Sequence, residues 1–226
     1  MIKAIAFDLD DTLLDTTGLL VKKASAEAFE ILIQNGLRLN LEQCESLRLE
    51  LIKKMSHKEV FEKLASEYGT TQTQQASHLA VQRFYEPHLP PHLPLLDGAK
   101  ENLIYLKPKY KLYLVTAGHE KAQKQKAQAL GINHFFEKIY VINSLEKKRK
   151  HSAFLEIITL NNLQPHELLC IGNSLSSEIQ DGLKIGATTC YFEFGEDRGT
   201  QLNADLNFKP TYHIHNHSEL IKVCQL

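Results

Sequence analysis

The chain has 226 residues, of which 43% are hydrophobic and 23% charged, so it can bury one substantial core and a smaller attached unit. This composition excludes an intrinsically disordered protein. Its 26 Lys and Arg against 27 Asp and Glu give a formal net charge of −1, and no apolar run approaches membrane-spanning length. We therefore expect neither nucleic acid nor a membrane as a partner.

The N-terminal half begins with a strand signal and continues as helices. Residues 1–10, MIKAIAFDLD, form a nearly continuous apolar run that ends in acids, which predicts a strand covered on both faces of a parallel sheet. From about residue 16 to residue 86, apolar residues recur at helical spacing, and Gly36 and Gly69 are predicted helix stops. Residues 87–98, PHLPPHLPLLDG, hold four of the seven prolines, which predicts a return linker.

After the linker, strand signals alternate with helix signals. Strands are predicted at 110–115, 138–142, 168–171 and 188–192, with a last one in TYHIHN, 211–216. Helices are predicted at about 120–130, 150–160 and 177–185. This alternation predicts an α/β fold with a doubly wound, Rossmann-like parallel sheet. The core comprises residues 1–15 and 93–226, and residues 16–92 are a helical insertion with the linker at its end.

Acids follow the first strand, at the edge of the sheet where such folds bind ligands. Asp8, Asp10 and Asp11 lie within DLDDT, and three crowded carboxylates repel one another unless a cation relieves the charge. Strand alternation directs Asp8 and Asp10 to the same side. We therefore expect a divalent metal here, and rank an acidic turn that caps a helix as the weaker alternative.

Two other strand ends supply polar partners. Thr116 and Ala117 follow the second core strand, and Asn173 follows the fourth, with Glu178 a turn further on. The side-chain oxygen of Asn173 suits Mg²⁺ but brings no charge. At an effective dielectric constant of about 20, a neutral amide in place of a carboxylate about 4 Å from a cation weakens their attraction by about 4 kcal/mol for each unit of charge on the cation. The carboxylate of Glu178 is expected to restore much of that loss.

These segments resemble the four ordered motifs of the haloacid dehalogenase-like (HAD) hydrolases. FDLDDTLLDT resembles the first motif, Asp-x-Asp-x-Thr, and LYLVTAG resembles the second, a strand ending in Thr. A lysine before the third long helix resembles the third motif, and IGNSLSSEIQDGLKIGA occupies the place of the fourth. The resemblance covers essentially the whole chain, and the insertion is similar to the family's helical cap, which closes over the substrate.

The resemblance implies a Mg²⁺-dependent phosphatase that hydrolyses a small phosphorylated metabolite through an aspartyl phosphate. Asp8 would be the nucleophile, and Asp10 the general acid and base. Thr116 and Ala117 would bind the phosphoryl group. The Mg²⁺ ligands carried over from the family are Asp8, Asp10, Asn173 and Glu178. An acid at position 10 favours phosphate esters over carbon–halogen bonds, because the dehalogenases lack one there.

The basic run KKRK contains the lysine of the third motif, which would bind the substrate and neutralise charge during transfer. The family spacing to Phe154 favours Lys150, and Lys148 is the second choice. The other basic side chains are interpreted as a solvated cluster.

Two alternative functions share this fold. The first is a degenerate HAD-like domain that binds a phosphorylated ligand or a protein partner without turnover, and its motivation is Asn173. The second is a phosphomutase, which would transfer the phosphoryl group to a sugar in place of water. The substrate, the cap residues that select it and the oligomeric state are left open.

The remaining polar features are interpreted as structural. The histidines of HIHNH, residues 213–217, are expected to face different ways because strand side chains alternate. Ser174, Ser176 and Ser177 are interpreted as helix caps. The four cysteines are far apart and include no C-x-x-C pair, which indicates reduced, buried thiols in a cytoplasmic protein.

Overall fold

A computed structural model describes residues 1–143, 149–196 and 209–226. The chain forms two compact units. Among the described residues, the first unit contains Met1–Thr16, Leu89–Gly195 and 209–226, and the second contains Thr17–His88 with Glu196. The second-choice lysine, Lys148, lies outside the described residues.

The first unit is built on a parallel sheet of six strands in the order β3-β2-β1-β4-β5-β6, which confirms the predicted α/β class. The strands are β1 (Ala4–Phe7), β2 (Lys111–Ala117), β3 (Lys138–Ile142), β4 (Leu168–Gly172), β5 (Thr188–Phe192) and β6 (Tyr212–Ile214). All four residues of β1 are buried between β2 and β4, as expected for a central strand of a covered sheet.

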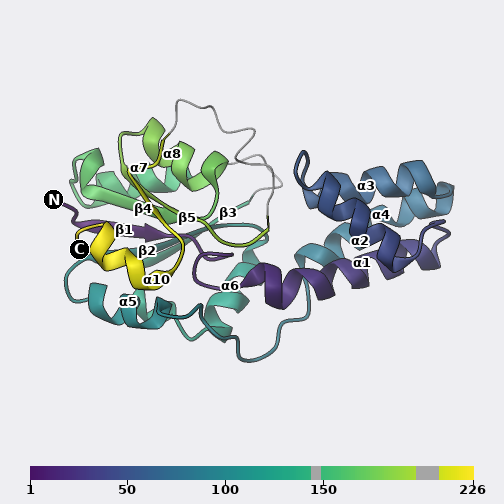
Figure 1. Cartoon of the computed structure of the whole chain (residues 1–226), viewed down its shortest axis with the longest axis horizontal. Coiled ribbons are helices and arrows are strands. Elements are labelled where there is room, and N and C mark those ends of the chain that lie inside the picture. The colour runs from purple at the N-terminus through teal and green to yellow at the C-terminus, as the bar shows by residue number, and fades with distance from the viewer. Residues whose placement is uncertain (144–148, 197–208) are drawn as a thin grey trace. The chain divides into compact units, whose positions relative to one another are not determined.

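Helices cover both faces of this sheet (Figure 1). Helices α5 (Ala99–Leu106), α6 (Glu120–Ala129) and α10 (His217–Val223) lie on one face, with α7 (His151–Leu160) and α8 (Gln180–Lys184) on the other. Short turns of helix are η2 (Asn133–Phe135), η4 (Pro165–Glu167) and the π-helical η5 (Leu175–Ile179). Phe154 and Ile157 of α7 pack against Tyr113, Val115 and Leu168 of the sheet. None of the helices in the described part of the chain is long and apolar enough to cross a membrane.

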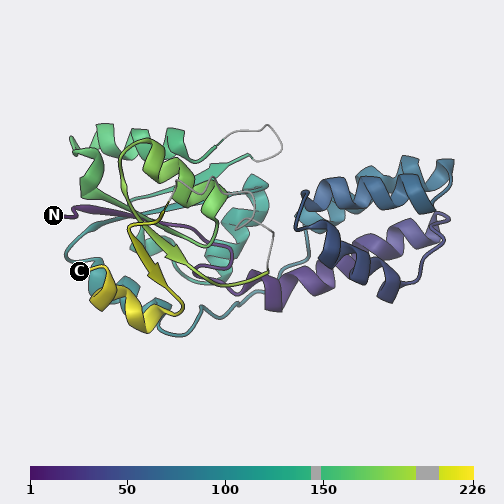
Figure 2. The ribbon, with the colours of Figure 1, turned by 45° about the horizontal axis from the view of Figure 1, so that its top comes forward.

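In its described residues the second unit is a helical bundle made of four α-helices, which Figure 2 shows. They are α1 (Lys22–Gln34), preceded by the π-helical turn η1 (Thr17–Val21), α2 (Leu41–Leu51), α3 (His57–Tyr68) and α4 (Thr71–Tyr85). Asn40, Ser56 and Thr70 cap α2, α3 and α4, each accepting a hydrogen bond from the backbone N–H three residues on. The bundle core is apolar, and Phe29 and Phe61 meet edge to face at its centre.

The two predicted helix stops work in different ways. Gly36 adopts a left-handed conformation with φ of 93°, which glycine adopts without strain. Gly69 is extended, with φ of −102°, and it ends α3 without a left-handed conformation. A Cβ at Gly69 would lie 2.6 Å from the Cβ of Thr73, so here the small residue permits close packing of α3 on α4.

Candidate active site

The nucleophile predicted from sequence lies directly beyond β1. The Asp8 N–H donates to the Ile171 carbonyl of β4 at 2.9 Å, which extends the strand pairing, and the Asp8 side chain is buried. The chain then turns sharply through Asp11, which has φ of 52°, a left-handed value that is uncommon outside glycine. The turn places Asp8 and Asp10 of DLDDT at the carboxyl edge of the sheet.

Asp8 shares one lysine with Glu178. Lys150 Nζ lies 2.6 Å from Asp8 Oδ1 and also contacts Glu178 Oε1, and all three residues are buried. Burial raises the pKa of Asp8 to about 7, because Lys150 offsets only part of the desolvation while the charge of Glu178 adds to it. The pKa of Lys150 is raised because its two carboxylates outweigh its burial. The lysine preferred from family spacing is therefore the one beside Asp8.

A second lysine, which the sequence analysis missed, holds Asp10. Lys126 Nζ lies 2.6 Å from Asp10 Oδ1, and the Thr16 hydroxyl donates to the same oxygen at 2.5 Å. Gln123 donates to Asp10 Oδ2 at 2.8 Å. Burial alone would raise the pKa of Asp10, but Lys126 and the hydrogen bonds outweigh it and hold the pKa below its usual range.

Thr116 lies on β2 with its hydroxyl buried and without a hydrogen-bond partner in the described part of the chain. A buried hydroxyl normally has a partner, so this one is available to a ligand oxygen. The neighbouring Ala117 carbonyl accepts from Gln123 Nε2 at 2.9 Å. Gln123 therefore links the end of β2 to Asp10.

In the loop after β4 and the helix that follows it, Glu178 and Asn173 bind different partners. Glu178 accepts from the Ser174 N–H at 3.0 Å while it contacts Lys150. The half-buried Asn173 donates from Nδ2 to the Phe194 carbonyl at 3.2 Å, a bond that an aspartate cannot make. Ser174 is at the N-cap of η5, as predicted, but its side chain does not cap a backbone N–H. The Ser174 hydroxyl is instead hydrogen-bonded to the Ser176 hydroxyl at 3.5 Å.

Asp181 anchors the chain beside Lys150. Arg149 Nε donates to Asp181 Oδ1 at 2.7 Å, and the His151 N–H donates to Asp181 Oδ2 at 3.3 Å. Lys150 lies between Arg149 and His151 in the sequence. The buried Asp181 carboxylate, which binds both of these neighbours, therefore fixes the backbone that carries the lysine.

The oxygen-rich groups fit the Mg²⁺ that the fold family implies. Asp8 and Glu178 both contact Lys150, so two acidic groups face a single cationic side chain. Mg²⁺ in phosphate-binding sites typically takes one or two carboxylates and completes its shell with water and phosphate oxygens. Asp8, Glu178, the Asn173 oxygen and Asp10 are the groups that would hold it.

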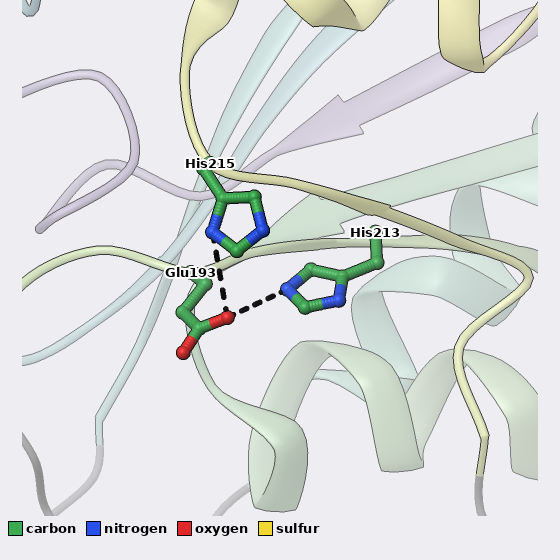
Figure 3. Close-up of side chains that lie close together, drawn as sticks. All are labelled: Glu193, His213 and His215. Atoms are coloured by element: carbon green, nitrogen blue, oxygen red, sulfur yellow. Dashed lines mark hydrogen bonds and ion pairs between the residues drawn. The ribbon is translucent and has the colours of Figure 1, made fainter.

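The expectation that the histidines of HIHNH face different ways is wrong for two of them. His213 and His215 are two residues apart, so strand alternation places them on the same side. Both contact Glu193 Oε2, from 2.8 Å and 3.5 Å respectively (Figure 3). His217 is buried instead, and its Nε2 donates to the Thr12 carbonyl at 2.7 Å.

Comparison with known proteins agrees with this fold. The family model for haloacid dehalogenase-like hydrolases matches residues 5–192. The glyceraldehyde 3-phosphate phosphatase of Pyrococcus abyssi is 30% identical over 213 residues, covering 87% of this chain and 83% of that protein. The N-acylneuraminate-9-phosphatase of Mus musculus is 26% identical over 202 residues, covering 82% and 79% respectively.

Solved structures show the same similarity. The HAD-hydrolase YfnB of Bacillus subtilis, bound to magnesium, has 25% identity and a TM-score of 0.66, with 98% of this chain and 97% of that chain covered. A haloacid dehalogenase-like family hydrolase from Streptococcus pneumoniae has a TM-score of 0.70 at 21% identity, with the same coverage, and supports the fold alone. The chain belongs to the haloacid dehalogenase-like hydrolases. Within that family it is a phosphatase, that is, a phosphoric monoester hydrolase.

Proposed function

We propose that the protein is a Mg²⁺-dependent phosphatase that hydrolyses a small phosphorylated metabolite through an aspartyl phosphate on Asp8. The observation that carries this proposal is the buried cluster of Asp8, Lys150 and Glu178. The Thr116 hydroxyl, on the strand adjacent to β1 and without a hydrogen-bond partner among the described residues, supports it.

In this proposal Asp8 attacks phosphorus, which divides the hydrolysis into formation and breakdown of an acyl phosphate. Lys150 orients the Asp8 carboxylate and compensates the charge of the transferred group, and Thr116 with Ala117 binds that group. Asp10 gives a proton to the leaving alcohol and later takes one from the attacking water. Mg²⁺, when bound, supplies the positive charge that offsets repulsion between the anionic nucleophile and the substrate.

The direct test is hydrolysis of p-nitrophenyl phosphate and a metabolite panel with and without Mg²⁺. The panel begins with glyceraldehyde 3-phosphate and N-acylneuraminate 9-phosphate, the substrates in the names of two relatives. Asp8→Asn is expected to lose several orders of magnitude in kcat. Asp97→Asn, which changes an exposed acid of the same unit, is expected to retain activity. Full activity of Asp8→Asn, or hydrolysis indifferent to Mg²⁺, contradicts the proposal.

The fate of the phosphoryl group separates the alternatives. Acid quenching during turnover of labelled substrate should leave label on Asp8, and release of inorganic phosphate identifies water as the acceptor. Transfer of label to an added sugar would indicate a phosphomutase instead. Ligand binding without either outcome would indicate the degenerate domain.

We also propose that the enzyme is cytoplasmic. All four cysteines are free and buried, as in a protein kept in a reducing compartment. Fractionation of cells that express the full chain, with immunodetection, tests this location. Recovery in a membrane or secreted fraction would contradict it.

A further inference from the structure

We propose that Glu193, His213 and His215 form a surface site for a transition-metal ion of the Zn²⁺ class, separate from the phosphatase site. Each residue offers one ligand atom, and the three atoms all lie within 4.8 Å of one another. Figure 3 shows both imidazole rings turned toward the Glu193 carboxylate. In the described part of the chain, this is the only such group of three among histidines, cysteines and acids.

The sheet holds the three residues in register. β5 and β6 are parallel neighbours, with Phe192 opposite Ile214, and the Glu193 N–H donates to the Ile214 carbonyl at 2.9 Å. Ile214 is buried and points inward, so the residues on either side of it, His213 and His215, project outward toward Glu193. The backbone of His215 is fixed in addition, because its N–H donates to Glu219 at 2.9 Å.

The distances are close to those that a metal requires. A tetrahedral Zn²⁺ with bonds of about 2.0–2.1 Å separates its ligand atoms by roughly 3.3 Å. Glu193 Oε2 lies 2.8 Å from His213 Nε2 and 3.5 Å from His215 Nδ1, and the two nitrogens lie within 4.8 Å of each other, so side-chain rotations would bring all three atoms to an ion. All three side chains are at least 40% exposed, which gives an ion access and leaves positions for water or a further ligand.

The donor set selects the kind of metal. Two imidazole nitrogens and one carboxylate suit Zn²⁺, Ni²⁺ and Cu²⁺, whereas Mg²⁺ prefers oxygen ligands alone. The candidate ligands of the phosphatase site differ in type, because Asp8, Glu178 and Asn173 offer only oxygen atoms to a metal. The two sites are therefore expected to bind different metals from the same solution.

Calorimetric titration of the untagged full chain with ZnCl₂, in excess MgCl₂ to saturate the oxygen site, tests the proposal. Wild type should bind one Zn²⁺ per chain, and His213→Ala/His215→Ala should bind it roughly tenfold more weakly or not at all. His166→Ala removes an exposed histidine elsewhere in the same unit and should bind like wild type. Equal binding by wild type and the double variant, or no binding by wild type, overturns the proposal.

A more conservative variant distinguishes loss of a metal ligand from misfolding. Glu193→Gln keeps the shape of the side chain but removes its charge, so it should weaken Zn²⁺ binding while far-UV circular dichroism stays unchanged. Zn²⁺ should also raise the Tm of wild type more than that of Glu193→Gln, because an ion that binds only the folded state stabilises it. Equal shifts for the two proteins would contradict a site at Glu193.

Discussion

At the scale of single residues, the most informative contact is that between Asp10 and Lys126. A general acid must carry a proton when the substrate binds, yet Lys126, Thr16 and Gln123 all stabilise the ionised form of Asp10. We predict that Lys126→Met raises the pKa of Asp10 and moves the alkaline limb of the kcat/KM profile to higher pH. The profile with p-nitrophenyl phosphate, from acid to alkaline pH, measures the shift.

Lys126→Arg is the control, because it keeps a cation beside Asp10 and should leave the limb near its wild-type position. A purely structural role for Lys126 would lower kcat at all pH values without moving the limb. That outcome would also argue against Asp10 as the proton donor.

The sequence did not predict this contact, for a reason specific to helix α6. Its sequence, EKAQKQKAQA, contains three lysines, and alanine is its only apolar residue type. The hydrophobic pattern therefore gives no reason to expect that any of the three lysines is buried. Lys126 and Gln123 are three residues apart and share one face, but only the position of α6 relative to Asp10 selects that face. Asp8 was predictable because it directly follows an apolar strand run, and Lys150 was favoured because the resemblance to the family gives a spacing to Phe154.

At the scale of elements, the junction of β4 with η5 depends on a glycine. A Cβ at Gly172 would lie 2.8 Å from Glu178 Cβ and closer still to its Cγ, so Glu178 needs this space to reach Lys150. We predict that Gly172→Ala displaces the Glu178 carboxylate and raises the Mg²⁺ concentration for half-maximal activity several-fold. Steady-state assays at increasing MgCl₂ concentration measure the effect.

Gly131→Ala serves as the matched control. Its φ of 67° makes alanine unfavourable there, yet nothing lies within 4 Å of the added Cβ. It should lower the free energy of unfolding by about 1 kcal/mol and leave the Mg²⁺ dependence unchanged. Identical Mg²⁺ dependence in the two variants would mean that Gly172 is not needed for the position of Glu178.

The second unit contains an ion-pair network around the buried Arg48. Arg48 Nη2 lies 2.6 Å from Glu45 and 2.6 Å from Glu196, and Nη1 lies 3.0 Å from His57 Nε2. Arginine only donates, so this His57 nitrogen accepts. We predict that Arg48→Met lowers the free energy of unfolding by about 3–5 kcal/mol, because the Glu196 side chain, only 9% exposed, then lacks the positive charge of Arg48.

Urea unfolding monitored by circular dichroism measures this loss. Lys58→Met is the comparison, since its pair with Glu62 is about half exposed and should contribute about 0–1 kcal/mol. Equal effects of the two substitutions would show that the Arg48 network does not stabilise the unit.

At the scale of the whole molecule, the sequence was most informative where the hydrophobic pattern of a short segment directly reflects the burial of that segment in the fold. Apolar runs marked β1 to β5, and most clearly the inner strands such as β1, because a covered parallel sheet buries both faces of an inner strand. The edge strand β6 was marked by alternation instead, and its His213 is exposed. Contacts between residues far apart in sequence were not predictable in this way. Glu193 with His213, and Arg48 with Glu196, each require the chain to return from a distant element.

Protonation of Asp8 links folding to metal binding. Its pKa is about 7 in the folded chain against an ordinary 3.8, so the folded state holds this proton more tightly than the unfolded state. The resulting stabilisation is fully present below about pH 4 and is lost as the pH rises through 7. A Mg²⁺ ion on the Asp8 carboxylate competes with the same proton.

We therefore predict that Mg²⁺ raises the Tm more at pH 8 than at pH 5.5, because at the lower pH Asp8 is mostly protonated. Differential scanning fluorimetry with MgCl₂ or EDTA at both pH values measures the two shifts. Asp8→Asn should respond less to Mg²⁺ at pH 8 and should differ little between the two pH values. Shifts of equal size at both pH values in the wild type would place the Mg²⁺ on groups other than Asp8.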